Sequence, residues 1–577
     1  MAAIHRLFST AVSHHREGRL HEAQSGYLQV LHKNDRHADA LHLLGVVLSE
    51  AGRHDLAGAL IRKAILVNGP TAEFCGNLGL VLARQGSAPA AIACLRKALE
   101  LDGSNAAWHY ELANLLHRQS ALDEAASHYE AAIDAHPDHI AAHFNLGVTR
   151  MMQSRLQEAL LALERTLQLH PLHAEALNNL GIVLQAEGKL NEASERYDRA
   201  RQIRPDYFDA HYNFALVCQE LDRLEEAAEV YGELLSRRPS HAEAHNNLGN
   251  VQLALGNSKQ ARVCYQQAVR YNPLHHDANW NLGLADLLHG DFAAGWVGYE
   301  WRLQGAAAAT LPVSGQRVLL CAEQGLGDTI QFLRYAPMVK ALGTHVTLQC
   351  ASELTQLARS ARGIDRVIAP ADAAKYRQDF DCKLPLLSLP RLFATTTIDR
   401  IPDSVPYLSP DPKLVSVWRK RLGPAGFKVG LAWAGNPLHR NDRNRSIPLE
   451  ALGDLVQTPG VRFFSLQKGG TLPGAESLGP ALANFAETAA AAANLDLIVS
   501  VDTSIAHLAG ALHRPAWVLL PFAPDWRWML NRNDSPWYPG MRLFRQARRK
   551  EWKPVLDQVK SELEKLVSQH SSHSEAV

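Results

Sequence analysis

The chain has few cysteines and no excess of charge of either sign. Seven cysteines are scattered through 577 residues, and no two of them form a Cys-x-x-Cys pair. This usage predicts reduced thiols in a cytoplasmic protein and argues against a disulfide framework. The 59 Lys and Arg residues balance the 59 Asp and Glu residues, so charge favours neither nucleic acid nor an anionic membrane as the main partner.

Long apolar runs are also missing. No run approaches the roughly 20 apolar residues that a membrane-spanning helix needs. The chain begins Met1 to Arg6 without a basic leader followed by an apolar stretch, so we expect no targeting segment and no membrane span. A length of 577 residues is too great for one hydrophobic core and predicts two or three folding units.

Small residues recur every 34 positions in the first half of the chain. A second small residue follows each of them after 12 positions, and proline follows five of them after 24. The first set is Ala11, Gly45, Gly79, Ala113, Gly147, Gly181, Ala215, Gly249 and Gly283, and the prolines are Pro137, Pro171, Pro205, Pro239 and Pro273. This period is typical of tetratricopeptide (TPR) helix pairs, whose helices approach closely at the small residues and whose second helix ends at the proline.

The period predicts an all-α TPR superhelix over residues 4–309, with about nine repeats and a degenerate last one. Large residues stand in and after the ninth repeat, at Trp296, Tyr299 and Trp301. They predict a terminal helix that docks onto another part of the chain.

Asparagine occupies one register position, two residues before the phased small residue. It stands at Asn77, Asn145, Asn179, Asn213, Asn247 and Asn281, with Glu111 in its place in the fourth repeat. Asparagine is a weak helix former whose amide both donates and accepts, which suits it to holding an extended acceptor peptide. The alternative is that these amides bond to the neighbouring repeat and stabilise stacking.

Histidine repeats at another register position, just after the turn between repeats. His37, His139, His173, His241 and His275 share it. Repetition at a structural position predicts a role at the helix start or on the surface rather than zinc binding.

From Arg317 the pattern changes to short apolar runs alternating with helical stretches, which is typical of α/β units with a parallel sheet. The runs are 318–322, 346–350 and 367–369, followed by 429–433, 463–466, 495–501 and 517–520. They predict an α/β module of two Rossmann-like lobes, residues 316–410 and 425–567, joined through a short helix that ends near Gly423. Ligands of such sheets bind at the carboxyl ends of the strands.

The first of these strands leads into a glycine-containing turn with Gln324, Gly325, Gly327 and Asp328. The two glycines allow a tight turn and close approach of a ligand to the backbone. The third glycine of a dinucleotide fingerprint is missing, which disfavours a dinucleotide. Asp328 is either the N-terminal cap of the next helix or a base that points towards the ligand, and the spacing is compatible with both.

A second strand leads into Asp502, Thr503, Ser504 and, one turn later, His507. Hydroxyls and unpaired backbone N–H groups at a helix start bind a diphosphate well. The same residues are also the commonest helix caps, and His507 is either a ligand contact or a packed side chain.

Two further strand ends carry polar loops. The first holds Asn436 and Arg445, with His439, Arg440 and Arg443 between them, and the second holds Gln467 and Lys468. The cations of these loops are candidates to neutralise a phosphate, and Asn436 and Gln467 are further candidates for donor binding. A solvated charged loop is the alternative. The aromatic stretch 522–538, with Trp526, Trp528, Trp537 and Tyr538 among charged residues, suits a sugar face or an interface.

GLGD at 325–328 together with DTSIAHLAGAL at 502–512 resembles the ADP-heptose:lipopolysaccharide heptosyltransferase family, which has the GT-B fold. The resemblance covers about residues 316 to 550. It implies that Asp328 is the general base and that Asp502 and Thr503 contact the donor sugar and its phosphates. The phosphate-binding lysine of that family has no clear equivalent here, and Arg440, Arg443 and Arg445 are candidates to replace it.

Joined to TPR repeats, the chain resembles bacterial TPR-containing protein glycosyltransferases, a class proposed to modify flagellin and other proteins. The asparagine ladder resembles that in the TPR groove of O-linked N-acetylglucosamine protein transferases. These resemblances imply a metal-independent inverting glycosyltransferase that moves a sugar from a nucleotide-diphosphate sugar, its substrate, to a Ser or Thr hydroxyl of a polypeptide. No other cofactor is expected, and TPR arrays often form homo-oligomers. A TPR scaffold with a non-catalytic nucleotide-binding module, or an enzyme that acts on a glycan or lipid, are the alternatives.

Overall fold

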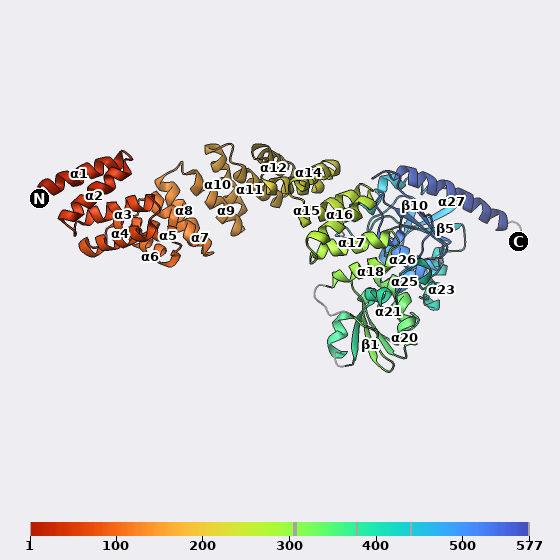
Figure 1. The fold of residues 1–577 in the computed structure, drawn as a ribbon. Coiled ribbons are helices and arrows are strands. Elements are labelled where there is room, and N and C mark those ends of the chain that lie inside the picture. Colours follow the sequence, from red (N-terminus) through yellow and green to blue (C-terminus); the bar gives the residue numbers. More distant parts are fainter. Residues whose placement is uncertain (1, 304–308, 377–378, 439–440, 575–577) are drawn as a thin grey trace. The chain divides into compact units, whose positions relative to one another are not determined.

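The computed structural model describes residues 2–303, 309–376, 379–438 and 441–574 (Figure 1). The chain forms two compact units, Met1–Val230 and Tyr231–Val577. The boundary lies inside one helix, α14 (Leu224–Arg237). The last repeats therefore belong to the same unit as the α/β part of the chain.

Unit 1 consists of helix pairs with the predicted spacing. Its helices are α1 (Ala2–Arg16), α2 (Leu20–Lys33), α3 (Ala38–Glu50), α4 (His54–Asn68), α5 (Ala72–Arg84), α6 (Ala88–Leu101), α7 (Ala106–Arg118), α8 (Leu122–Ala135), α9 (Ile140–Met152), α10 (Leu156–Leu169), α11 (Ala174–Ala186), α12 (Leu190–Ile203), α13 (Phe208–Glu220) and the first half of α14. In unit 2 the repeats continue with α15 (Ala242–Ala254), α16 (Ser258–Tyr271), α17 (His276–Leu288), α18 (Phe292–Tyr299) and the 3-10 turn η1 (Glu300–Arg302).

The phased small residues allow the two helices of a pair to approach, as predicted. A Cβ built on Gly181 would lie 2.6 Å from Tyr197 Cε1, and one built on Gly249 would lie 2.4 Å from Tyr265 Cε1. Both distances are too short for a real Cβ contact. In these two repeats the small residue therefore makes room for a tyrosine of the second helix, 16 positions later.

The repeated histidines start helices, and this prediction is confirmed. The backbone N–H of Ala176 donates to His173 Nδ1 at 3.3 Å, and that of Ala244 donates to His241 Nδ1 at 3.2 Å. His37, His139 and His275 accept in the same way. An imidazole that accepts through Nδ1 satisfies one of the unpaired donors of a helix start.

The α/β part of unit 2 has two open parallel sheets, as the apolar runs predicted. The first has the order β3-β2-β1-β4 and consists of β1 (Arg317–Cys321), β2 (His345–Gln349), β3 (Arg366–Ile368) and β4 (Cys382–Pro385). The second has the order β10-β9-β8-β5-β6-β7 and consists of β5 (Phe427–Ala432), β6 (Val461–Ser465), β7 (Ala475–Ser477), β8 (Leu497–Val501), β9 (Ala516–Leu520) and β10 (Met541–Arg545). In register, Val318 pairs with Val346, and Val429 with Leu497.

Short helices connect the strands (Figure 1). Around the first sheet they are α19 (Leu326–Phe332), η2 (Leu333–Tyr335), α20 (Ala336–Ala341), α21 (Ser352–Ala358), η3 (Pro370–Tyr376), η4 (Leu386–Ser388), α22 (Leu389–Leu392) and η5 (Ile398–Arg400). The expected helix before Gly423 is α23 (Pro412–Leu422). Around the second sheet they are α24 (Asp442–Arg445), η6 (Leu449–Leu452), η7 (Gly479–Ala481), α25 (Phe485–Ala492), α26 (Ser504–Ala511) and η8 (Trp526–Trp528). The long helix α27 (Lys553–Ser574) follows the last strand.

The last repeat helix docks onto the α/β part, as its large residues predicted. Trp296 and Tyr299 are buried in one core with Phe332, Trp526 and Trp537. The Trp296 indole N–H also donates to the carbonyl oxygen of Thr395 at 2.8 Å. Aromatic packing of this kind contributes strongly to stability, so the end of the array is part of the core of unit 2.

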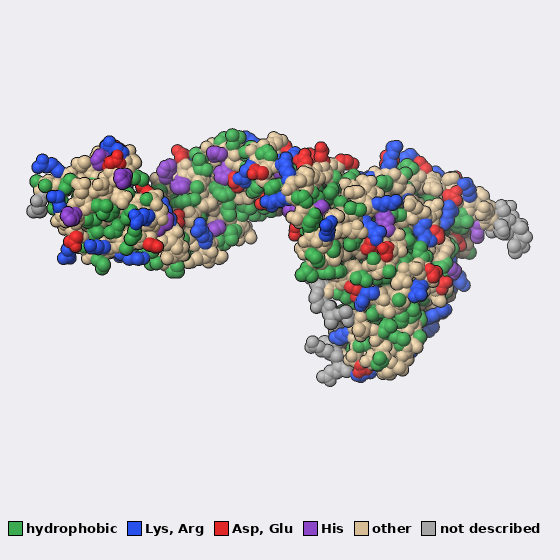
Figure 2. Space-filling view, viewed as in Figure 1, with side chains coloured by type: hydrophobic (Ala, Val, Ile, Leu, Met, Phe, Trp, Pro, Cys, Tyr) green, Lys and Arg blue, Asp and Glu red, His purple; other side chains and the backbone are tan. Residues whose placement is uncertain are grey.

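Basic and acidic side chains are interspersed over the face of the molecule shown in Figure 2. This distribution agrees with the balanced charge of the sequence. Among the described residues, no helix is both long enough and apolar enough to cross a membrane.

Candidate functional site

The two sequence motifs meet where the first turns of α19 and α26 pack against each other. A Cβ built on Gly327 would lie 2.8 Å from His507 Cδ2 and 3.4 Å from Ser504 Cα. The absence of a side chain at Gly327 therefore lets the two helices approach. Gly325, at the tip of the same turn, is exposed. The structure thus brings together residues that are almost 180 positions apart in the sequence.

Asp328 uses both carboxylate oxygens. Oδ2 accepts a hydrogen bond of 2.8 Å from the backbone N–H of Gly325, so Asp328 caps α19. Oδ1 is paired with the Arg527 guanidinium. The capping role is confirmed, and the role of a general base stays a prediction.

Arg527 is a buried member of the site that the sequence did not single out. Its Nε donates to Gln331 Oε1 at 2.7 Å, its Nη1 donates to Asp525 Oδ1 at 2.9 Å, and its Nη2 donates to Asp328. Burial opposes its charge, but Asp525 and Asp328 outweigh this effect and raise the pKa of Arg527 well above its usual range. In the sequence, Arg527 stands between two tryptophans. This position predicted a sugar face or an interface rather than an ion pair.

Asp502 is half-buried directly after β8. Burial and the nearby Asp525 carboxylate raise the pKa of Asp502 to about 6, although Arg445 and Arg527 act in the opposite direction. Burial and a neighbouring negative charge both disfavour the ionised form of a carboxyl group. Asp502 therefore belongs to the same electrostatic cluster as the ion pair of Asp328.

Thr503 and His507 have structural contacts in α26. Thr503 Oγ1 accepts from the backbone N–H of Ile505 at 3.3 Å, which confirms the capping role, and Ser504 is the first residue of the helix. His507 is 5% exposed and lies 2.9 Å from the Tyr538 hydroxyl through Nδ1. Burial lowers the pKa of His507 well below its usual range, so the imidazole is neutral. These contacts support the packed interpretation of His507, and donor binding by it stays a prediction.

The loop after β5 supports the same region. Arg445 Nη1 donates to the carbonyl oxygen of Asp502 at 2.9 Å, and its Nε donates to Asp442 Oδ1 at 3.2 Å. Asn436 is exposed and its Oδ1 accepts from the N–H of Leu438 at 3.0 Å. Arg443 is exposed, whereas His439 and Arg440 lie outside the described residues. Of the arginines proposed for phosphate binding, Arg445 is thus the one seen to brace the end of β8.

The loop after β6 carries Gln467 and Lys468. Gln467 Oε1 accepts from the backbone N–H of Ala434 at 3.3 Å, which ties this loop to the one after β5. Lys468 is exposed. Because β8, β5 and β6 are adjacent parallel strands, their carboxyl ends share one edge of the sheet.

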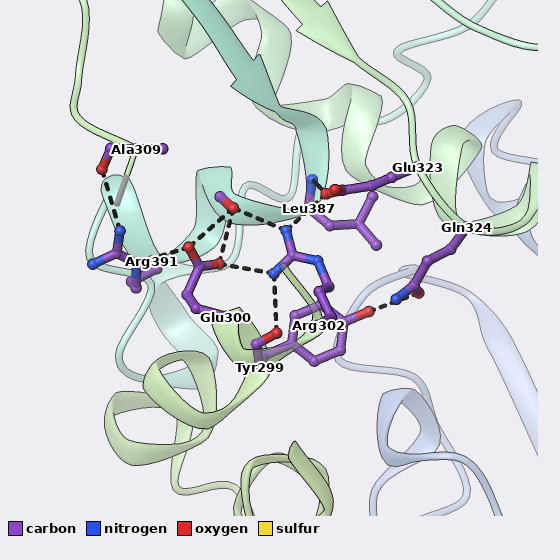
Figure 3. A network of polar contacts seen from close by, with 9 residues as sticks. Tyr299, Glu300, Arg302, Ala309, Glu323, Gln324, Leu387 and Arg391 are labelled. Carbon is purple, nitrogen blue, oxygen red and sulfur yellow. Dashed lines mark hydrogen bonds and ion pairs between the residues drawn. The ribbon is translucent and has the colours of Figure 1, made fainter. Parts of the chain in front are cut away.

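A second network holds the turn before Asp328 (Figure 3). The Arg302 side chain is 5% exposed and donates to Glu300 at 2.8 Å and to Glu323 at 2.7 Å. The Tyr299 hydroxyl donates to Gln324 Oε1 at 3.1 Å. Gln324 has a φ of 61°, a left-handed conformation that is unusual for a residue with a side chain. Residues of α18 and η1 therefore fix both residues that precede Gly325.

The asparagine ladder makes contacts between repeats. Asn145 Nδ2 donates to Asn114 Oδ1 at 3.0 Å and to the Tyr110 hydroxyl at 3.2 Å. Asn77, Asn213 and Asn281 donate to His42, Asn178 and Asn246, each in the preceding repeat. Asn179 and Asn247 accept from the adjacent residues of their own helices, Asn178 and Asn246. The stacking role is therefore confirmed for the other four asparagines, and peptide binding by all six stays a prediction.

Comparison with known proteins identifies the repeats. Tetratricopeptide repeat family models match residues 10–73, 77–140, 122–172, 208–241 and 242–274, and a TPR repeat model matches 184–222. The chain therefore contains TPR repeats across its N-terminal half.

Protein FlbA of Caulobacter vibrioides is 28% identical over 319 residues, which cover 48% of this chain and 52% of FlbA. The match thus spans about half the length of this curated relative. Among solved structures, YrrB, described as a TPR protein with an unusual peptide-binding site, is 22% identical with a TM-score of 0.31, over 32% of this chain and 96% of YrrB. PilF of Pseudomonas aeruginosa is 21% identical with a TM-score of 0.31, over 36% of this chain and 93% of that structure.

Proposed function

We propose that this protein is an inverting glycosyltransferase of GT-B architecture that needs no metal ion. It moves a sugar from a nucleotide-diphosphate sugar to a Ser or Thr hydroxyl of a polypeptide. The main observation in favour is the packing of the first turn of α19 against that of α26. This packing gathers Asp328, Asp502 and Thr503 beside the carboxyl ends of parallel strands, where ligands of such sheets bind.

In the proposed reaction, the acceptor hydroxyl oxygen attacks C1 of the sugar from the face opposite the diphosphate. The new O–C1 bond forms as the bond between C1 and the phosphate oxygen breaks. Asp328 takes the hydroxyl proton, and the nucleoside diphosphate leaves with the electron pair. The N-terminal turn of α26 and the exposed Lys468 stabilise the charge of the leaving group.

Arg527 has a positioning role in this mechanism. A carboxylate offers about four lone-pair sites, so the bonds from Gly325 and Arg527 leave Asp328 capacity to receive a proton. The same two bonds fix the orientation of the carboxylate. A fixed base near the reacting atom is what general base catalysis requires.

The TPR repeats would bind the polypeptide acceptor. TPR proteins commonly bind peptides, and a repeat array joined to the site raises the effective concentration of a bound acceptor. The half-buried asparagines are the residues we propose to contact the peptide backbone. The resemblance found in the sequence favours flagellin or another cell-surface protein as this acceptor.

Paired substitutions test the proposal. Asp328→Asn and Asp525→Asn each remove one carboxylate partner of Arg527. A base at position 328 predicts that Asp328→Asn slows sugar transfer by about 100- to 10,000-fold, whereas Asp525→Asn slows it much less. Turnover is measured by release of nucleoside diphosphate and by the mass of the acceptor. Equal losses in the two variants would show that Asp328 acts only through Arg527.

A TPR scaffold with a non-catalytic α/β module is the second candidate. The observation in its favour is that both oxygens of Asp328 already have partners within the protein. A non-catalytic module would not turn over nucleotide sugars, even where it still binds them and gains thermal stability. Release of nucleoside diphosphate from a panel of nucleotide-diphosphate sugars, measured with the full chain, distinguishes the two functions.

A further inference from the structure

In several repeats, the residue 16 positions after the phased small residue is a tyrosine of the second helix. The hydroxyl of this tyrosine has a partner within the array. Tyr129 donates to Asn114 Oδ1 at 2.7 Å, and Tyr197 donates to Gln185 Oε1 at 2.9 Å. Tyr265, in the eighth repeat, donates to Asn250 Oδ1 at 2.9 Å. These hydroxyls satisfy polar groups inside the helix pairs.

Tyr299 occupies the same register position in the ninth repeat, 34 residues after Tyr265. Its hydroxyl bonds instead to Gln324 Oε1, in the turn between β1 and α19 (Figure 3). Gln324 precedes Gly325, whose N–H is bonded to Asp328. One hydrogen bond therefore joins the last repeat to the turn that carries the proposed base.

The surroundings make Tyr299 a rigid anchor. Tyr299 is 1% exposed, and its ring lies 4.8 Å from the Arg302 guanidinium and contacts Trp526 edge-on at 5.8 Å between centroids. Burial raises the pKa of the Tyr299 phenol, so the hydroxyl keeps its proton and donates throughout the physiological pH range. Gln324 is held in a left-handed conformation, with a φ of 61°. Such a conformation persists only where its surroundings impose it.

We propose that Tyr299 is a positioning residue for the glycosyl transfer site. The last register tyrosine of the array fixes the Gln324 turn and, through Gly325, the direction of the Asp328 carboxylate. The last repeat is thus part of the transfer machinery as well as of the acceptor-binding array. The inference deepens the proposed function and rests on it for its catalytic consequence.

The test compares Tyr299→Phe with Tyr265→Phe in the full chain. Both changes remove a hydroxyl at the same register position, and they differ in whether its partner lies in the turn before Asp328 or inside the array. Loss of one neutral hydrogen bond predicts a kcat about 3- to 10-fold lower for Tyr299→Phe, with the KM for the donor changed by less than about twofold. Tyr265→Phe keeps the wild-type kcat. Equal kcat values for the two variants would overturn the inference.

A second variant tests whether the two side chains act together. Gln324→Met removes the acceptor and keeps a side chain of similar length. If the Tyr299–Gln324 bond carries the effect, the double variant is no slower than Gln324→Met alone. If the kcat of the double variant falls by the product of the two single losses, the inference is overturned.

Amide hydrogen exchange gives a readout that does not depend on activity. We expect exchange across residues 323–328 to be about 3- to 10-fold faster in Tyr299→Phe and unchanged in Tyr265→Phe. If the wild-type protein turns over no nucleotide sugar, the proposed function fails, whereas faster exchange still supports the anchoring role. Unchanged exchange in Tyr299→Phe overturns that role whether or not the protein is an enzyme.

Discussion

Replacing Gly327 with alanine tests the contact on which the site is built. The added Cβ would lie 2.8 Å from His507 Cδ2 and 3.4 Å from Ser504 Cα. His507 has little freedom to move, because it is bonded to Tyr538 and stacked on Trp528 at 5.5 Å between ring centroids. Overpacking of this kind costs about 1–3 kcal/mol, and alanine recovers about 0.5–1 kcal/mol of helix preference. We therefore expect a net loss of about 1–2 kcal/mol.

Urea unfolding followed by tryptophan fluorescence measures this loss. All tryptophans except Trp108 follow residue 231, so the signal reports mainly on unit 2. With an m-value of about 3 kcal/mol/M, the midpoint should fall by about 0.5 M. Gly469→Ala is the matched control, because a Cβ built there has nothing within 4 Å. A midpoint for Gly327→Ala at or above that of the wild type would refute the close-approach argument.

Three further outcomes follow from the contacts described above. Arg302→Met should destabilise unit 2 by about 1.5–3 kcal/mol, because Glu300 and Glu323 lose the charge-assisted hydrogen bonds from Arg302. Glu300 keeps Arg391 and Glu323 keeps the backbone N–H of Leu387. Arg317→Met, at an exposed pair, should cost less than about 1 kcal/mol in urea unfolding. Asn145→Ala should cost unit 1 about 1–2 kcal/mol, measured by urea unfolding followed by circular dichroism, because two hydrogen bonds between repeats are lost. Burial lowers the pKa of His173, so the imidazole binds a proton less readily in the folded chain than in the unfolded chain. The neutral imidazole caps its helix, and the stability that this cap contributes is present above the unfolded pKa of about 6.5. This stability is lost as the pH falls. His173→Asn, which caps without titrating, should therefore lose less thermal stability than the wild type between pH 7 and pH 5, and an identical pH dependence would contradict this reasoning.

The strands that the sequence missed are β4, β7 and β10, and all three lie at sheet edges. Central strands β8 and β9 are buried along their whole length, so they appear as continuous apolar runs. An edge strand has a neighbour on one side and exposes more side chains, as β7 and β10 do. The sequences of β4, β7 and β10 are mixed or short, and the apolar pattern does not reveal them, although it did predict the edge strand β3.

The asparagine ladder shows that repeat spacing predicts the position of a side chain but not its contacts. Spacing placed the six asparagines correctly at one repeat position. It left open which groups their amides contact, since a register position does not say which neighbour a side chain meets. The bonds to His42, Asn178 and Asn246 became visible only when the repeats were stacked.

The amino-acid sequence alone determined the TPR repeats, the central parallel strands and the two motifs at strand ends. Each of these leaves a local mark: a period, an apolar run or a turn residue. The tertiary structure decided that Arg527 pairs with Asp328, 199 residues away, and that Tyr299 holds Gln324. Contacts between distant segments depend on how helices and strands pack, and packing leaves no period in the sequence from which the partner could be read.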